Sequence, residues 1–248
     1  MSSDKPNTLE KIERAYEKRE RIPKERYSFL NPSVFIPWQE RERVFLHFLN
    51  KNYFRKKDIS ELSFLEVGCG TGANILQFIR YGFTPEKITA NELLPERVKT
   101  ARIILPSSVT IVLGDASQVP FENAPFDLIL VSTVFSSILD HDFRKKLALR
   151  LWDLLSIDGA VLWYDFIYNN PRNPDVEGIS VGELKALFPD SYITYKKVTL
   201  APPISRFILS VAPWNWIYSC FNLPFLRTHI VAWIQKTLIN NNSLKSLK

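Results

Sequence analysis

The sequence predicts an α/β fold with a doubly wound, mostly parallel sheet, and three observations support this prediction. From residue 60 onward, short apolar runs alternate with segments whose apolar residues recur at helical spacing. Glycines follow the first apolar run at every second position, at Gly68, Gly70 and Gly72. The chain has 248 residues, 46% of them hydrophobic, which suffices for one well-cored domain with additions. Strands that alternate with helices imply a parallel sheet covered on both faces.

Residues 1–58 are expected to form a helical cap that precedes the sheet. Residues 1–26 carry Glu, Lys and Arg at helical offsets with few apolar anchors, which is typical of a surface helix. Residues 27–37 are predicted as a loop interrupted by two prolines, and residues 38–51 as a stronger helix with an apolar side. Three polar residues of this part could contact a ligand or serve only in turns and caps: Tyr27, Asn31 and Gln39.

The alternating part of the chain supplies the elements of the sheet. It contains five strand-like runs: Ser63–Val67, Lys87–Asn91, Val109–Leu113, Phe126–Val131 and Ala160–Tyr164. Helices are predicted over Ala73–Arg80, from Pro95 onward, over Arg144–Leu155 and over Val181–Leu187. Asp158 and Gly159 are predicted as the turn before the fifth run. Two further strand-like runs follow, over 191–200 and 228–236.

The segment between these last two runs is unusually apolar. Phe207 to Leu226 contains no charged residue over a length that could span a bilayer, but Pro213 and Pro224 interrupt it. We interpret residues 203–226 as a hydrophobic lid over an active site, with docking at a membrane surface as the alternative. Three parts of the chain are therefore expected: a cap over 1–58, a main domain over 59–240 and a tail over 241–248.

Charge and cysteine content limit the partners and the compartment. The net charge is +6, and no acidic residue follows Asp190. A phosphorylated substrate or a membrane surface explains this charge better than nucleic acid, because the basic residues are scattered and no nucleic-acid-binding motif accompanies them. The two cysteines, Cys69 and Cys220, do not form a disulfide framework, which suits a reducing, cytoplasmic compartment.

The glycine-rich stretch resembles the first motif of the class I S-adenosylmethionine-dependent methyltransferases. That motif is an acidic residue, an apolar residue and then G-x-G-x-G, and residues 66–72 (EVGCGTG) match it at each position. A dinucleotide-binding loop has its third glycine three residues after the second, which is position 73 here. That loop also tolerates alanine at this position, and residue 73 is Ala73, so an NAD-linked oxidoreductase stays open as an alternative. The resemblance implies a seven-stranded sheet whose last two runs form an antiparallel hairpin, with the apolar segment inserted between them.

The resemblance also implies where the cofactor, S-adenosylmethionine, would bind. Glu66 would lie near its methionine amino group, and Glu92 would accept the ribose hydroxyls. Asp115 and Ala116 would lie near the adenine. The expected cofactor-binding residues all follow or end predicted strands: Glu66, Gly68, Gly70, Glu92, Asp115, Ala116 and Ser132. Thr133 and Phe135, after the fourth run, are expected on the methionine and acceptor side.

Methyl transfer often requires that a proton be removed from the acceptor. We expect Asp165, at the end of the fifth strand, as the first candidate for the general base, in a polar cluster with Tyr164, Tyr168 and Arg172. His229 is the second candidate, with a structural role as the alternative. The other two histidines are expected to be structural: His47 within a helix and His141 in an Asp-His-Asp helix cap. Beyond the Asp140–Asp142 cluster, no carboxylate–histidine array has metal-ligand spacing, so no metal is expected.

The prediction of the methyl acceptor rests on the family resemblance more than on any single residue. The Asn-Pro-Pro-aromatic signature of methyltransferases acting on amide or exocyclic nitrogens is absent after the fourth run, where residues 132–135 read STVF. Residues 31–32, 133–140, 163–166, 170–174 and 226–229, taken together, resemble a bacterial subgroup tied to cell-surface polysaccharide synthesis. The predicted reaction is therefore O-methylation of a sugar, a sugar nucleotide or a lipid-linked glycan, in the cytoplasm or at the inner membrane. Two alternatives stay open: methylation of a lipid or small metabolite, and a non-catalytic cofactor-binding module.

Overall fold

A seven-stranded sheet with the order β3-β2-β1-β4-β5-β7-β6 forms the centre of the protein. The computed structural model describes residues 8–20, 23–53, 56–170, 173–211 and 215–237. The strands are β1 (Phe64–Val67), β2 (Ile88–Glu92), β3 (Thr110–Leu113), β4 (Phe126–Ser132), β5 (Leu155–Phe166), β6 (Ser191–Leu200) and β7 (Arg227–Lys236). The first five are parallel, and β7 is antiparallel to both of its neighbours. The predicted fold class and the closing hairpin are confirmed.

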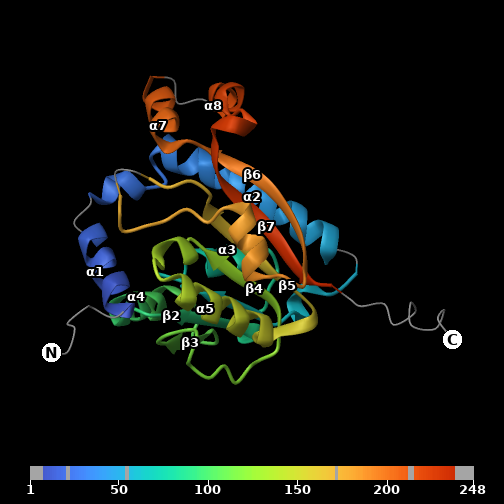
Figure 1. Ribbon diagram of the computed structural model, residues 1–248. Helices are drawn as coiled ribbons and strands as arrows, with labels where there is room; N and C mark the ends of the chain where they lie inside the picture. The colour runs from blue at the N-terminus through green and yellow to red at the C-terminus, as the bar shows by residue number, and fades with distance from the viewer. Residues whose placement is uncertain (1–7, 21–22, 54–55, 171–172, 212–214, 238–248) are drawn as a thin grey trace.

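Helices cover both faces of this sheet (Figure 1). They are α1 (Thr8–Glu20), α2 (Pro32–Asn52), α3 (Ala73–Arg80), α4 (Pro95–Ile104), α5 (His141–Leu154), α6 (Val181–Leu187), α7 (Pro202–Val211) and α8 (Asn215–Phe221). One core packs α5 and α6 against the sheet, and a second core packs α2, α3 and α4 against the opposite face. The carboxyl ends of β1, β2 and β4 therefore meet at one edge between two layers of helices.

Helix α2 begins six residues before the predicted helix, so the predicted loop over 27–37 is wrong from Pro32 onward. The side chain of Asn31 accepts the backbone N–H of Ser33 at 3.0 Å and caps the helix. Proline is favourable at the first helical position because its missing N–H has no partner there. Pro37 lies inside the helix, where it removes one backbone donor near the start. Of the two roles weighed for Asn31, capping is confirmed.

Strand β5 is longer than predicted and includes Asp158 and Gly159, which we had expected in a turn. Helix α5 ends at Leu154, and the strand begins at the next residue. The register of β5 on β4 shifts between Phe126 and Leu128, and this irregularity takes up the extra residues of β5. The turn prediction failed because an Asp-Gly pair can lie in a bulged strand as well as in a turn.

The apolar insertion folds into α7, α8 and a short 3₁₀ turn. Hydrogen bonds to Glu40 of α2 connect this insertion to the end of β6. The Glu40 carboxylate accepts the Thr199 backbone N–H at 2.9 Å, the Tyr218 hydroxyl at 2.9 Å and the Asn222 amide at 2.6 Å. Arg227 lies 3.8 Å from the same carboxylate. Across the described ranges, no helix is long and apolar enough to cross a bilayer. The expected tail over 241–248 lies outside the described residues.

Candidate active site

The glycine-rich turn joins β1 to α3 in a conformation that only glycine adopts without strain. The φ angles of Gly68, Gly70 and Gly72 are +70°, +59° and +91°. A Cβ atom at Gly68 would lie 2.7 Å from Cγ2 of Val134, and one at Gly72 would lie 2.8 Å from the Leu105 side chain. The turn therefore brings bare backbone close to its neighbours and presents the N–H groups of the α3 N-terminus to a ligand.

Glu92, the last residue of β2, holds this turn in place. Its carboxylate accepts the Gly70 N–H at 2.8 Å, the Leu93 N–H at 2.8 Å and the Leu94 N–H at 3.0 Å. A carboxylate has about four acceptor sites, so it retains capacity for a ligand hydroxyl. Glu92 thus links the glycine turn to the start of α4 and still lines the pocket beside it.

Glu66 of β1 is buried in the same region with half of its carboxylate unused. Its Oε1 atom accepts the side-chain amide of Asn74 at 2.7 Å. Its Oε2 atom is buried and has no hydrogen-bond partner among the described residues. Burial raises the pKa of Glu66 to about 8. A buried acceptor without a partner is unfavourable, so this atom fits a cationic N–H donor brought by a ligand.

A pocket opens at the carboxyl ends of β1, β2 and β3, and four of the predicted cofactor residues line it: Gly68, Glu92, Asp115 and Ala116. The Asp115 carboxylate also accepts the backbone N–H and the hydroxyl of Ser117, both at 2.8 Å, which fixes the turn after β3. Gly70 does not line the pocket itself, but its backbone N–H donates a hydrogen bond to Glu92, which does. Ser132 lies at the end of β4, beside Tyr164 of β5, and does not line this pocket.

Helix α1 forms the outer wall of this pocket, which the sequence did not predict. Leu9, Ile12 and Tyr16 line it, one side of the helix at i, i+3 and i+7. The guanidinium of Arg97 in α4 lies 4.2 Å from the centre of the Tyr16 ring, and Figure 1 shows α1 beside α4. The helical spacing of these three residues could have indicated a buried side of α1. The many charged residues around them made the segment look like a surface helix instead.

The two candidate bases lie on opposite faces of the sheet. Asp165 is 1% exposed, and its carboxylate accepts the backbone N–H groups of Ser136 at 3.1 Å and Phe166 at 2.9 Å. Burial raises the pKa of Asp165 to about 7. Successive side chains of a strand alternate between faces, so the neighbouring Tyr164 points the other way, toward His229 of β7.

His229 is stacked on Tyr164 with 5.2 Å between ring centres. Its Nδ1 atom lies 3.0 Å from the Thr228 hydroxyl. Burial and the nearby positive charge of Arg41 lower the pKa of His229 to about 4, so the imidazole is neutral at pH 7. His229 pairs with Phe166, the last residue of β5, so the ring lies at the edge where the parallel strands end.

Arg41 of α2 connects the His229 side of this edge to the glycine turn, and sequence reasoning missed it. Its guanidinium lies 5.2 Å from the centre of the Tyr164 ring. It also donates to the side chain of Asn74 at 2.9 Å, and Asn74 in turn donates to Glu66. No local spacing signals this chain of contacts, because it joins a helix before the sheet to β1, α3 and β5.

The remaining predicted polar residues lie away from the pocket. Asp140 caps α5 through the backbone N–H groups of the residues that follow, which confirms the capping role of the Asp-His-Asp cluster. His141 lies 3.4 Å from Glu177. Tyr168 is 51% exposed, and Arg172 falls outside the described residues. Within the described part of the chain, no three potential metal ligands come together.

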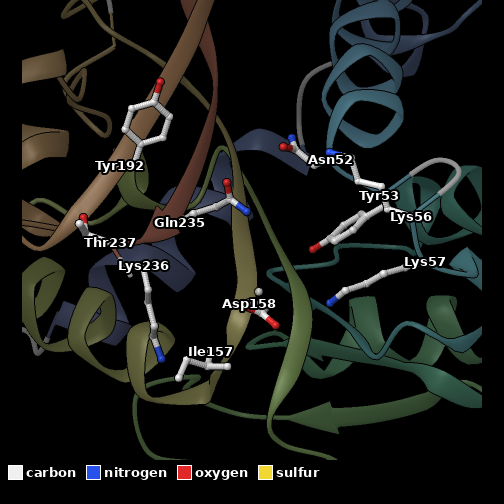
Figure 2. A pocket seen from close by; sticks show the side chains of 11 residues that line it. Asn52, Tyr53, Lys56, Lys57, Ile157, Asp158, Tyr192, Gln235, Lys236 and Thr237 are labelled. Carbon is white, nitrogen blue, oxygen red and sulfur yellow. The ribbon is translucent and has the colours of Figure 1, made fainter. Parts of the chain in front are cut away.

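A larger open pocket of about 500 Å³ lies near the start of β5, away from the glycine turn. Figure 2 shows Tyr53, Lys57 and Asp158 pointing into it. Its basic side chains already have partners, since Lys236 donates to the Leu155 carbonyl at 2.8 Å and Lys57 lies 3.9 Å from Asp127. Ligands of open α/β sheets bind at the carboxyl ends of the strands. We therefore place the candidate site at the smaller pocket.

Comparison with known families agrees with this placement. A family model described as a methyltransferase domain matches residues 64–159, from β1 into β5. Over these residues the chain is similar to methyltransferase domains. Two of the solved structures described below contain S-adenosylhomocysteine or sinefungin. The matched residues include the glycine turn and the ends of the first four strands.

Individual relatives are distant. Norajmaline N-methyltransferase from Rauvolfia serpentina is 26% identical over 129 residues, which is 50% of this chain and 42% of that protein, so the match spans less than half of that relative. The 1,6-didemethyltoxoflavin-N1-methyltransferase of Burkholderia thailandensis, solved with S-adenosylhomocysteine, is 18% identical with a TM-score of 0.50, over 70% of this chain and 71% of that chain. The glycopeptide N-methyltransferase MtfA, complexed with sinefungin, is 13% identical with a TM-score of 0.52, over 77% and 92%. These two structures share the fold of the methyltransferase domain.

Proposed function

We propose that this protein transfers a methyl group from S-adenosylmethionine to a hydroxyl of a sugar, a sugar nucleotide or a lipid-linked glycan. The observation that carries the proposal is the pocket at the strand ends, where the glycine turn meets the carboxylates of Glu92 and Asp115. Glu66 is fully buried on the neighbouring strand and does not line this pocket. Glu66 would hold the amino group of the cofactor, Glu92 the ribose hydroxyls, and Asp115 with Ala116 the adenine. When bound there, the cofactor supplies a methyl carbon attached to a sulfonium.

The unpartnered Oε2 atom of Glu66 supports this orientation and leads to a pH prediction. In the free protein the raised pKa, about 8, keeps the carboxyl largely protonated at pH 7. Binding of an ammonium group favours the ionised form, so the proton must leave when the ligand binds. We expect the affinity for S-adenosylhomocysteine to fall about tenfold for each pH unit below about 8.

Titration calorimetry with S-adenosylhomocysteine between about pH 6 and pH 8 measures this slope. Glu66→Gln is the matched control, because the amide keeps the contact volume and an acceptor for Asn74 but cannot ionise. The variant should bind more weakly at pH 8 and lose the slope. If the wild-type affinity is constant over this range, Glu66 does not meet the amino group.

The proposal assigns the proton of the acceptor to His229. The imidazole would accept the proton of the acceptor hydroxyl when that oxygen takes the methyl group that the bound cofactor would supply. With Nδ1 beside the Thr228 hydroxyl, Nε2 is the nitrogen that can accept it. Asp165 was our first candidate, but both of its oxygens already accept backbone N–H groups on the other face of the sheet. His229 is therefore the proposed base, and Asp165 would position the Ser136 turn.

Transfer of labelled methyl into fractionated host extract tests the reaction. Label in the polysaccharide or glycolipid fraction supports a glycan acceptor. In the same assay, His229→Gln should lower the rate about 10²–10⁴-fold with unchanged S-adenosylhomocysteine binding. With S-adenosylmethionine kept saturating at every pH, the wild-type rate should stay level as the pH falls toward about 5, because a base of pKa about 4 remains deprotonated.

Three outcomes would contradict parts of this proposal. A rate at saturating S-adenosylmethionine that falls about tenfold per pH unit below about 7 would return the role of base to Asp165, whose carboxyl would become protonated there. Cofactor binding without label in any fraction would favour a non-catalytic binding module. Tighter binding of NAD than of S-adenosylhomocysteine would contradict methyl transfer altogether.

A second candidate is methylation of a small metabolite, and the relatives favour it. Those named above are N-methyltransferases, one of them solved with its small acceptor 1,6-didemethyltoxoflavin. Label confined to lipid or small-metabolite fractions would select this candidate and exclude the glycan.

A further inference from the structure

The insertion between β6 and β7 exposes large apolar side chains to solvent. We call residues 202–211 and 215–226 the apolar lobe; it comprises α7, α8 and the 3₁₀ turn Pro224–Leu226. Phe207 and Phe225 are each 72% exposed, and Trp216 is 62% exposed. Figure 1 shows α7 and α8 projecting beyond the sheet, at the top of the view. A surface of this kind usually marks an interaction site.

The start of α2 extends the same apolar surface. Ile36 packs against Leu209 of α7 and Tyr218 of α8, so the lobe adjoins the first turns of α2. Just before this contact, Leu30 is 95% exposed and Phe29 is 53% exposed. The apolar surface is therefore built from residues 29–35 and from the apolar lobe, which lie more than 150 residues apart in the chain.

The charged residues of the C-terminal part of the chain, which contains the apolar lobe, are all positive. No acidic residue follows Asp190, whereas seven basic residues do. Four of them lie on or next to the lobe in the chain: Lys196 and Lys197 near the end of β6, Arg206 on α7 and Arg227 at the start of β7. Lys236 lies at the far end of β7, and the last two lysines fall outside the described residues. Within the lobe, Arg206 is exposed beside Phe207. Exposed Trp and Phe on short helices, with Arg and without Asp or Glu, match helices that lie in the interface of anionic membranes. A second copy would instead bring two positive surfaces together.

We propose that the apolar lobe and residues 29–35 dock onto an anionic lipid bilayer, with α7 and α8 lying in the interface. This inference extends the proposed function by naming the surface on which the acceptor is met. The lobe ends at Leu226, three residues before His229 on β7. Docking would therefore bring the edge that holds the proposed base close to the membrane, where a lipid-linked acceptor is presented.

Vesicle sedimentation with the full-length protein tests the docking without any methyl transfer. The probes are vesicles of phosphatidylcholine alone and vesicles in which about one third is phosphatidylglycerol. We expect binding to the anionic vesicles that weakens with added salt. The triple variant Phe207→Ser, Trp216→Ser and Phe225→Ser should bind at least about tenfold more weakly.

A matched control removes equally exposed apolar side chains elsewhere: Ile103→Ser, Leu149→Ser and Ile157→Ser, at 84%, 62% and 72% exposure. This control should bind vesicles like the wild type, and both triple variants should still bind S-adenosylhomocysteine. Equal vesicle binding by the lobe variant, or none by the wild type, overturns the proposal. A wild-type dimer that the lobe variant abolishes would assign the surface to a second copy instead. Failure of methyl transfer alone affects only the proposed function.

Discussion

Replacing Gly68 with alanine is expected to weaken S-adenosylhomocysteine binding by at least about 100-fold. Gly68 has a φ of +70°, so an alanine there is strained before any contact is considered. Its Cβ would also lie 2.7 Å from Cγ2 of Val134, and both residues line the cofactor pocket. To relieve this clash, either the glycine turn or Val134 must move, and either movement changes the shape of the cofactor pocket. Titration calorimetry measures the loss.

Gly82→Ala is the matched control for backbone strain. Gly82 has a φ of +107° at the end of α3, and the nearest atom to a Cβ there, in Ile59, is 4.0 Å away. This variant should lose about 1–2 kcal/mol of stability through strain and keep its affinity for S-adenosylhomocysteine. Unchanged binding by Gly68→Ala would mean that the cofactor does not lie against the glycine turn.

The parts of the fold that the sequence predicted are those with a local cause. Strands of a parallel sheet are buried on both faces and read as continuous apolar runs, so the first four strands were located within one residue at each end. Helix α3 was located at Ala73–Arg80, because a glycine turn precedes it and a glycine follows its last turn. The same locality applies to Glu66, Glu92 and Asp115, which each end or follow a strand.

The parts that the sequence did not predict depend on tertiary contacts. Helix α1 looked like a charged surface helix, and only its packing on α4 shows that Tyr16 closes the pocket. The separation of Asp165 and His229 depends on the register of β7 on β5, in which Asp165 pairs with Ile230. A shift of that register by one residue would turn the His229 side chain to the other face, and no local pattern fixes the register.

Replacing Arg144 with methionine is expected to lower the free energy of unfolding by about 3–5 kcal/mol. Arg144 of α5 is fully buried, and its guanidinium bonds Glu183 at 2.7 Å and Glu177 at 2.8 Å. It also donates to the Ile138 carbonyl at 2.6 Å. Methionine fills much of the volume but leaves two carboxylates and a carbonyl without their donor. Chemical denaturation followed by circular dichroism measures the loss.

The same substitution should weaken cofactor binding, because Ile138 lines the pocket and Arg144 fixes its backbone. The adjacent Lys145→Met is the control, since Lys145 is 67% exposed and its contact with Asp142 at 3.3 Å is a surface ion pair. Arg144→Lys should recover only part of the stability, because an ammonium lacks the fork that reaches both carboxylates. If Arg144→Met were as stable as Lys145→Met, the α5–α6 contact would not depend on this buried charge. The pocket wall at Ile138 would then be held by apolar packing alone.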